Sequence, residues 1–152
     1  DGPHTRALSC APLVSTALLV GELAFEAVRT PGHTPGHLTF LGHGIVVSGD
    51  CLFLGRCGRA DLFGGDEAAL RASLLHLRSR MRRLPDDWLV LPGHRYQLSD
   101  GRNPTVMRLG ELLESNEAFA ALDHDDDWNA LPFLAFDDDL ATSARRQRAR
   151  GG

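Results

Sequence analysis

Four short segments constrain this chain more than any other feature, because each combines glycine, often with proline, with a histidine or an aspartate. They are Thr30-Pro31-Gly32-His33-Thr34-Pro35-Gly36-His37, Ser48-Gly49-Asp50, Cys57-Gly58-Arg59-Ala60-Asp61 and Leu91-Pro92-Gly93-His94-Arg95-Tyr96. Short β-prone runs precede them, over residues 23–28, 45–48 and 89–91. A rigid sheet can hold ligands at metal-bonding distance where its strands end. The sequence therefore predicts a metal site along one edge of a sheet.

The pattern around these segments predicts strands, a glycine-rich loop and two helices. Strands are expected over residues 23–28, 38–41, 45–48 and 88–91, and the glycines within 49–65 predict a loop that wraps closely around something. Asp66 is the expected N-cap of a helix that Pro85 ends. Its buried stripe is expected to be Leu70, Leu74, Leu77, Met81 and Leu84. A second helix is expected from Asn103, as its cap, to about Leu122.

Two residues suit metal ligation on chemical grounds. His33 lies between two Pro-Gly pairs that fix the backbone and leave the imidazole at the mouth of a strand, although an ordinary turn histidine is the alternative. Asp50 follows an apolar strand, where a carboxylate can bridge two cations or complete a His-His-Asp set on one iron. The alternative for Asp50 is a turn-forming aspartate. We expect His37 to support the site without binding the metal.

The order and composition of the four segments resemble the metallo-β-lactamase superfamily, and within it the glyoxalase II (hydroxyacylglutathione hydrolase) and persulfide dioxygenase branch. The resemblance covers residues 23–119 and implies an α/β (α+β) fold, the αββα sandwich of that superfamily. Here we expect mainly its C-terminal half, with one sheet, flanking helices and a C-terminal helical extension. The resemblance also implies that His33, Asp50 and His94 are metal ligands. Asp50 would be catalytic and would bridge two divalent ions, expected to be zinc, with His33 on one ion and His94 on the other.

The substrate residues are also implied by the resemblance. In that branch, a Cys-Gly-Lys/Arg loop and a His-x-Tyr segment contact glutathione, so Arg59 and Tyr96 are expected to bind substrate. Arginine offers a bidentate fork for a carboxylate, and tyrosine offers a phenolic donor. The alternative for Arg59 is that it pairs with Asp61 and braces the loop.

The activity that the resemblance implies is metal-dependent hydrolysis of a glutathione-like thioester. The alternative is a persulfide dioxygenase, in which His33 and Asp50 share one iron with an upstream histidine. The segment Cys57-Gly58-Arg59-Ala60-Asp61 favours the dioxygenase, whereas His94 and the Gly64-Gly65-Asp66 sequence favour the hydrolase. The expected partner is thus a small molecule, a glutathione thioester or persulfide.

The superfamily's upstream His-x-His-x-Asp-His segment does not occur in this sequence, where His4 is the only histidine before His33. We therefore expect residues 1–122 to be the C-terminal portion of a metallo-β-lactamase-like domain. Residues 123–152 are expected to be an acidic segment and a basic, disordered tail. A possibility of another class is a non-catalytic half-domain that pairs with the missing N-terminal half, with another chain or with itself.

The composition argues against several other functions. A net charge of -4 provides no general basic field for nucleic acid, and no apolar run approaches the roughly 18 residues of a membrane span. The three cysteines, Cys10, Cys51 and Cys57, are too few for a disulfide framework and predict a reducing, cytoplasmic compartment. Cys57 is expected to be structural, because no histidine or acid is spaced beside it as an activating partner.

Overall fold

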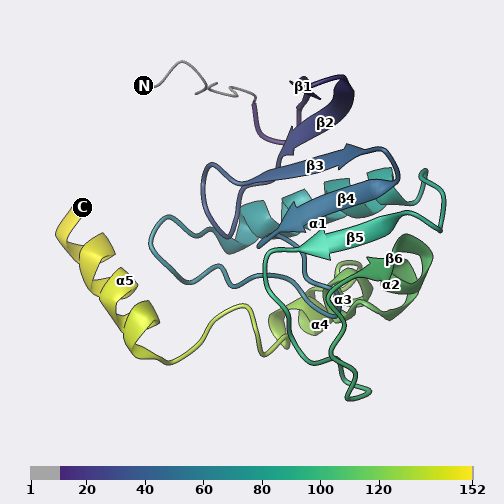
Figure 1. Cartoon of the computed structure of the whole chain (residues 1–152). Helices are drawn as coiled ribbons and strands as arrows, with labels where there is room; N and C mark the ends of the chain where they lie inside the picture. The colour runs from purple at the N-terminus through teal and green to yellow at the C-terminus, as the bar shows by residue number, and fades with distance from the viewer. Residues whose placement is uncertain (1–10, 152) are drawn as a thin grey trace.

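The computed structural model describes residues 11–151, in which a six-stranded mixed sheet forms the frame (Figure 1). The strands lie in chain order across the sheet: β1 (Ser15–Val20), β2 (Leu23–Arg29), β3 (Leu38–Gly42), β4 (Ile45–Gly49), β5 (Leu89–Pro92) and β6 (Met107–Arg108). Neighbouring strands are antiparallel except β4 and β5, which run parallel. The expected strands are therefore present, and the expected α+β class with one sheet and flanking helices is confirmed.

The helix α1 (Glu67–Met81) makes the crossover that a parallel pair requires. The chain leaves the sheet after β4, forms α1 and re-enters the sheet as β5. Asp66 caps it as expected, with a side-chain oxygen that accepts from the Ala69 N–H at 2.9 Å. The expected stripe is buried from Leu70 to Met81, and it joins Val46 and Val90 of the sheet in one core. Leu84 lies beyond the end of the helix and packs against this core.

The expected single helix from Asn103 to Leu122 is wrong. The chain forms β6 and then two shorter helices, α2 (Leu109–Ser115) and α3 (Glu117–Ala121). Asn116 separates them because it has an extended backbone, with φ −74° and ψ 118°. Its buried side chain accepts from the Phe119 N–H and donates to the Phe53 carbonyl at 2.9 Å, so it caps α3 and ties that helix to the glycine-rich loop.

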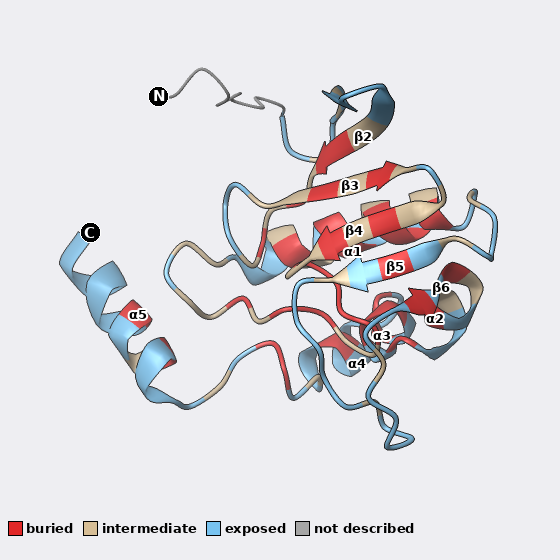
Figure 2. Ribbon diagram, viewed as in Figure 1, coloured by how far each residue is buried: buried red, intermediate tan, exposed pale blue. Residues whose placement is uncertain are grey.

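The C-terminal segment agrees with one expectation and differs from another. The structure describes two further helices there, α4 (Asp125–Asn129) and α5 (Asp139–Gly151), which fit the expected C-terminal helical extension but not the expected disordered tail. Trp128, Phe133 and Leu134 belong to the main core, so the expected boundary at residue 122 does not coincide with a break in packing. α5 stands apart from the sheet and is mostly exposed (Figure 2). No helix within residues 11–151 is long and apolar enough to cross a membrane. Cys10 and His4 lie outside the described residues.

The two faces of the sheet are covered unequally. α1 lies behind the sheet in Figure 1, and Leu41, Val46 and Val90 are buried on that side. Their neighbours along each strand alternate to the opposite face, where no helix of residues 11–151 lies across the strands. That face is nevertheless apolar, with Phe40 paired to Val47 and Val47 paired to Leu91.

Candidate active site

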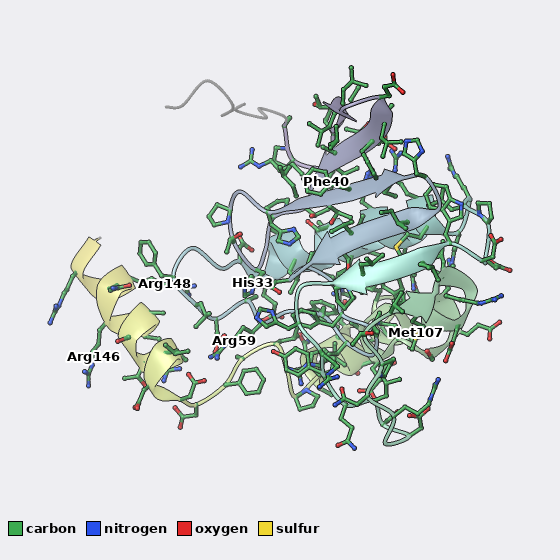
Figure 3. All side chains as sticks on the ribbon, in the orientation of Figure 1. His33, Phe40, Arg59, Met107, Arg146 and Arg148 are labelled. Carbon is green, nitrogen blue, oxygen red and sulfur yellow. The ribbon has the colours of Figure 1, made fainter. Side chains whose placement is uncertain are left out.

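The three expected metal ligands follow strands that end at the same edge of the sheet. β2 and β4 each run antiparallel to β3, and β5 runs parallel to β4, so β2, β4 and β5 all point in one direction. His33 follows β2, Asp50 directly follows β4, and His94 follows β5. Figure 3 shows His33 at the end to which the β4 and β5 arrows point. The sheet topology therefore brings the three residues together from distant parts of the sequence.

Asp50 lies between the two histidines. One of its carboxylate oxygens is 3.6 Å from Nε2 of His33, and the other accepts from Nδ1 of His94 at 2.6 Å. All three side chains line a cavity of about 600 Å³, as do Arg59 and Tyr96. The five site residues expected from the sequence therefore share one cavity.

The hydrogen bonds of His33 determine which of its nitrogens is available to a ligand. Nδ1 lies 2.8 Å from the Arg59 carbonyl, and a carbonyl can only accept, so Nδ1 carries the proton. Nε2 is the other ring nitrogen, and it faces Asp50. Metal-binding histidines typically donate one ring N–H to a carbonyl or carboxylate in this way, so the Nδ1 contact would leave Nε2 as the nitrogen for a metal.

Two glycines allow the loops to close tightly around Asp50. A Cβ atom at Gly58 would lie 2.0 Å from the Asp50 carbonyl oxygen, and one at Gly93 would lie 2.4 Å from its carboxylate. Both distances are too short for any side chain to be tolerated without a shift of the loop. The closeness of Asp50 therefore requires glycine at the middle of the Cys-Gly-Arg and Pro-Gly-His segments.

His37 supports the backbone of Asp50 and does not face the cavity as a ligand. Its Nε2 accepts from the N–H groups of Asp50 and Cys51 at 3.1 and 3.2 Å, and its Nδ1 is 2.8 Å from Oγ1 of Thr30. Burial, with the nearby His33, lowers the pKa of His37 to about 4, although Asp50 opposes the shift. The ring is thus held neutral, in the form that can accept at Nε2, which agrees with the supporting role expected from the sequence.

Arg59 forms the contacts of a loop brace. Its guanidinium donates to both oxygens of Asp61, at 2.6 and 2.8 Å, and to both oxygens of Asp138, at 2.8 and 3.1 Å. These hydrogen bonds to Asp61 and Asp138 raise the pKa of Arg59. Burial works to raise the pKa of Asp61, but the bonds from Arg59 and the Phe136 N–H outweigh it and lower that pKa. The geometry favours the bracing alternative, because the N–H groups of the Arg59 guanidinium are already bonded to two carboxylates.

Six residues of the cavity were not anticipated from the sequence, and three of them carry a charge or a ring that contacts an arginine: Arg56, Phe136 and Asp138. Arg56 directly precedes the Cys57-Gly58-Arg59 segment, a position that could have drawn attention to it. Phe136 and Asp138 lie in the acidic segment expected to be solvated surface, and no local signal separates them from the neighbouring residues. They reach the site because the chain between α4 and α5 passes along the cavity.

The two described cysteines are structural. Cys51 and Cys57 are fully buried. Burial raises the pKa of the Cys51 thiol to about 12 and raises that of Cys57 as well. A thiol that stays protonated is a poor nucleophile, so neither residue has the properties of a catalytic cysteine.

The donor set suits a transition metal, but it does not form a complete cluster. Imidazole nitrogen and carboxylate oxygen are ligands that both zinc and iron accept. Within residues 11–151, no three His, Cys, Asp or Glu side chains converge closely enough to hold an ion by themselves. The Nδ1–carboxylate contact between His94 and Asp50 occupies one oxygen that a metal would use. Metal ligation by His33, Asp50 and His94 therefore stays a prediction.

The mixed sheet with flanking helices defines an α+β protein, and the polar residues after its strands gather around one cavity. A family model described as the metallo-beta-lactamase superfamily matches residues 12–94, which is more than half of the sequence. The chain therefore belongs to the metallo-beta-lactamase superfamily and has its fold.

Known proteins of this family resemble the chain over part of their length. A hydroxyacylglutathione hydrolase from Aeromonas hydrophila is 45% identical over 80 residues, which are 53% of this chain and 29% of that enzyme. The crystal structure of ETHE1 from Myxococcus xanthus matches with a TM-score of 0.60 and 30% identity, over 90% of this chain and 58% of that one. That of TTHA1623 in a di-iron-bound form matches with a TM-score of 0.52 and 38% identity, over 72% of this chain and 48% of that one. The matches thus cover from 29% to 58% of the length of these proteins.

Proposed function

We propose that this chain carries part of the active site of a metal-dependent hydrolase of the glyoxalase II type, acting on a glutathione-like thioester. The observation that carries the proposal is the convergence of His33, Asp50 and His94 at one sheet edge, in one cavity. The name of the Aeromonas relative, hydroxyacylglutathione hydrolase, supports the choice of reaction.

The residues have separate roles in this proposal. His33 would bind metal through Nε2, His94 would bind a second ion, and Asp50 would be shared between them. Divalent ions held there, expected to be zinc, would lower the pKa of a bound water and polarise the thioester carbonyl. Phe53 and Tyr96 pack with their ring centroids 4.9 Å apart on the wall of the cavity, where they would limit the access of bulk water.

A second candidate is a persulfide dioxygenase that uses one iron. The similarity to ETHE1 extends over 90% of this chain, which supports this alternative. The di-iron-bound form of TTHA1623 supports iron as the metal, but two iron ions fit the two-metal hydrolase better than a one-iron site. His33 and Asp50 would then share the iron with a histidine from outside the described residues, and His94 would remain a partner of Asp50.

We further propose that the remaining ligands come from an upstream segment of the His-x-His-x-Asp-His type, on the same or on another polypeptide. Three of the residues that line the cavity are proposed as ligands, and a two-metal site needs more than three protein ligands in total. The alternative that is not an enzyme is a half-domain without catalytic activity. The experiment below distinguishes it from the hydrolase and the dioxygenase.

The test is the metal content and activity of Asp50→Ala. We expect the purified wild-type protein, assayed with the upstream segment present, to contain bound metal and to hydrolyse S-lactoylglutathione. Asp50→Ala should lose metal and activity together, because the carboxylate would be shared by both ions. Elemental analysis and a thioester assay measure the two quantities, and oxygen consumption with glutathione persulfide tests the dioxygenase.

Asp126→Ala is the matched control, since Asp126 is an exposed carboxylate on α4 that faces no ligand residue. Near-normal metal content and turnover in Asp50→Ala would rule out the bridging role. Iron with oxygen consumption would select the dioxygenase, and a metal-free, inactive wild type would select the half-domain.

A further inference from the structure

Arg56 is the arginine of the cavity whose hydrogen-bonding capacity is unused. Its Nε is buried and has no hydrogen-bond partner, and among residues 11–151 no acceptor contacts its guanidinium. The neighbouring Arg59, in contrast, is saturated by the carboxylates of Asp61 and Asp138. The buried Nε is out of reach of a ligand, so an anion in the cavity would bind through the terminal N–H groups of Arg56.

Aromatic rings hold the Arg56 guanidinium in place. Its central carbon lies 3.9 Å from the centroid of the Tyr96 ring, 5.3 Å from that of Phe133 and 5.9 Å from that of Phe136. Rings that contact the face of a guanidinium attract its charge but leave the N–H groups in its plane without acceptors. The fork is therefore fixed in orientation and still available, which favours bidentate binding of a planar anion.

The Arg56 backbone is also fixed. The Arg56 carbonyl accepts from the Phe53 N–H at 2.8 Å, and the buried Asn116 side chain donates to the same carbonyl at 3.4 Å. Arg56 lines the cavity that holds Asp50, and with Tyr96 it also lines an adjoining cavity of about 280 Å³. A ligand that reaches Asp50 can thus extend past Tyr96 to Arg56.

We infer that Arg56 is the anion-binding residue of this cavity, and that its ligand presents a carboxylate to the Arg56 fork while its reactive end lies at Asp50. Arg59, which the sequence suggested for this task, braces the loop that carries both arginines. The inference rests on the proposed function only in taking the cavity around Asp50 as the substrate cavity.

The experiment compares the binding of S-methylglutathione, which has free carboxylates, with that of its diethyl ester, by calorimetry. We expect the wild-type protein to bind the acid at least tenfold more tightly than the ester, since hydrogen bonds to charged groups contribute about 1.5–3 kcal/mol. Arg56→Gln should bind both ligands with similar affinity. Arg56→Lys keeps the charge without the fork and should recover only part of the preference.

Arg102→Gln is the matched control. Arg102 lines the adjoining cavity, but its guanidinium already donates to Asp100 and Glu111, so the preference for the acid should persist. Circular dichroism verifies that each variant is folded. An undiminished acid preference in folded Arg56→Gln, or a wild type that binds acid and ester equally or binds neither, would overturn the inference.

The outcome also separates the inference from the proposed function. An acid preference that depends on Arg56 in a protein without thioester hydrolysis would leave the inference standing and reject the hydrolase. Thioester hydrolysis by a protein whose acid preference Arg56→Gln does not alter would support the hydrolase and reject the inference.

Discussion

The position of Asp50 depends on hydrogen bonds that its own side chain does not make. His37 accepts from two successive backbone N–H groups where β4 ends, and it is linked through Thr30 to Thr39, with 2.9 Å between the two hydroxyl oxygens. An imidazole nitrogen is the acceptor that satisfies these N–H groups, which otherwise have none in the surrounding loop. The histidine that binds no metal in the proposal therefore positions the carboxylate that does.

His37→Phe should destabilise the fold and loosen the Asp50 turn. The phenyl ring keeps much of the volume but leaves the N–H groups of Asp50 and Cys51 without an acceptor, at a cost of about 1–3 kcal/mol for each buried group. Urea unfolding should therefore show a loss of roughly 2 kcal/mol or more.

His124→Phe serves as the comparison, because His124 is exposed and its side chain makes no capping hydrogen bond. It should change the free energy of unfolding by less than about 0.5 kcal/mol. Equal stabilities for the His37 and His124 variants would show that water replaces the imidazole as the acceptor.

Single residues could be predicted from the sequence where local backbone chemistry restricts them. The Pro-Gly pairs around His33 and the glycine before His94 identify turns at strand ends, and the structure brings both histidines to Asp50. The partners of Arg59 could not be predicted in full, since Asp138 lies 79 positions further along the chain. No local pattern connects two residues that meet only through the tertiary fold.

Among the elements, α5 is attached to the site loops largely by polar contacts. Asp138 caps its start by accepting from the Ala141 N–H at 2.8 Å and pairs with Arg59. Arg148, labelled in Figure 3, donates to the carbonyls of Leu62 and Gly65 at 2.5 and 3.0 Å. Only Ala141 and Ala144 of this helix are buried, so apolar packing contributes little to its attachment.

The attachment of α5 should weaken in strong acid. The bonds from Arg59 and from the Ala141 N–H lower the pKa of Asp138 from 3.8 to about 2. A carboxylate with a depressed folded-state pKa stabilises the fold fully above its unfolded pKa, and that contribution disappears as the pH falls from about 4 through 2. The amide signal of Ala141 in nuclear magnetic resonance spectra should therefore titrate with a midpoint near 2.

Arg59→Gln should shift the Ala141 midpoint back towards 3.8, because the main cause of the lowered pKa is removed. A midpoint near 3.8 in the wild type would mean that Asp138 and Arg59 do not pair in solution.

Elements with a strong period and clear end signals were predicted correctly, and the others were not. The alternating strands and the capped stripe of α1 satisfy local and tertiary requirements at once. A single helix was expected over residues 103–122, yet β6 forms within it and Asn116 interrupts it, because the Asn116 side chain bonds to the Phe53 carbonyl in a distant loop. A tertiary hydrogen bond thus overrides the local propensity.

At the scale of the whole molecule, one apolar face of the sheet is not covered by any helix of the described residues. Leu89 is 40% exposed and Leu91 36%, although both lie on β5 in the interior of the sheet. Apolar patches of this kind usually mark an interface. We propose that an upstream segment of the fold, or a second copy of the chain, packs here.

Leu89→Lys should therefore reduce self-association of this chain and weaken its pairing with the upstream half. A charged side chain on the contact face would have to be buried without a partner. Light scattering after size-exclusion chromatography measures both effects.

Leu75→Lys is the comparison, since Leu75 on α1 is also 40% exposed but lies away from this face. A wild-type chain that is monomeric at all concentrations, with or without the upstream half, would contradict the proposed interface.

The parallel pairing of β4 with β5 also determines when the site can form. His33 and Asp50 are connected through the local meander of β2, β3 and β4, which can assemble hairpin by hairpin. His94 is 44 positions beyond Asp50, and it arrives only after α1 has crossed the sheet and closed a long loop. His33 and Asp50 can therefore approach each other before His94 does, because only His94 needs the crossover. In the proposed metal site, His94 would be the last of the three residues to reach the ion.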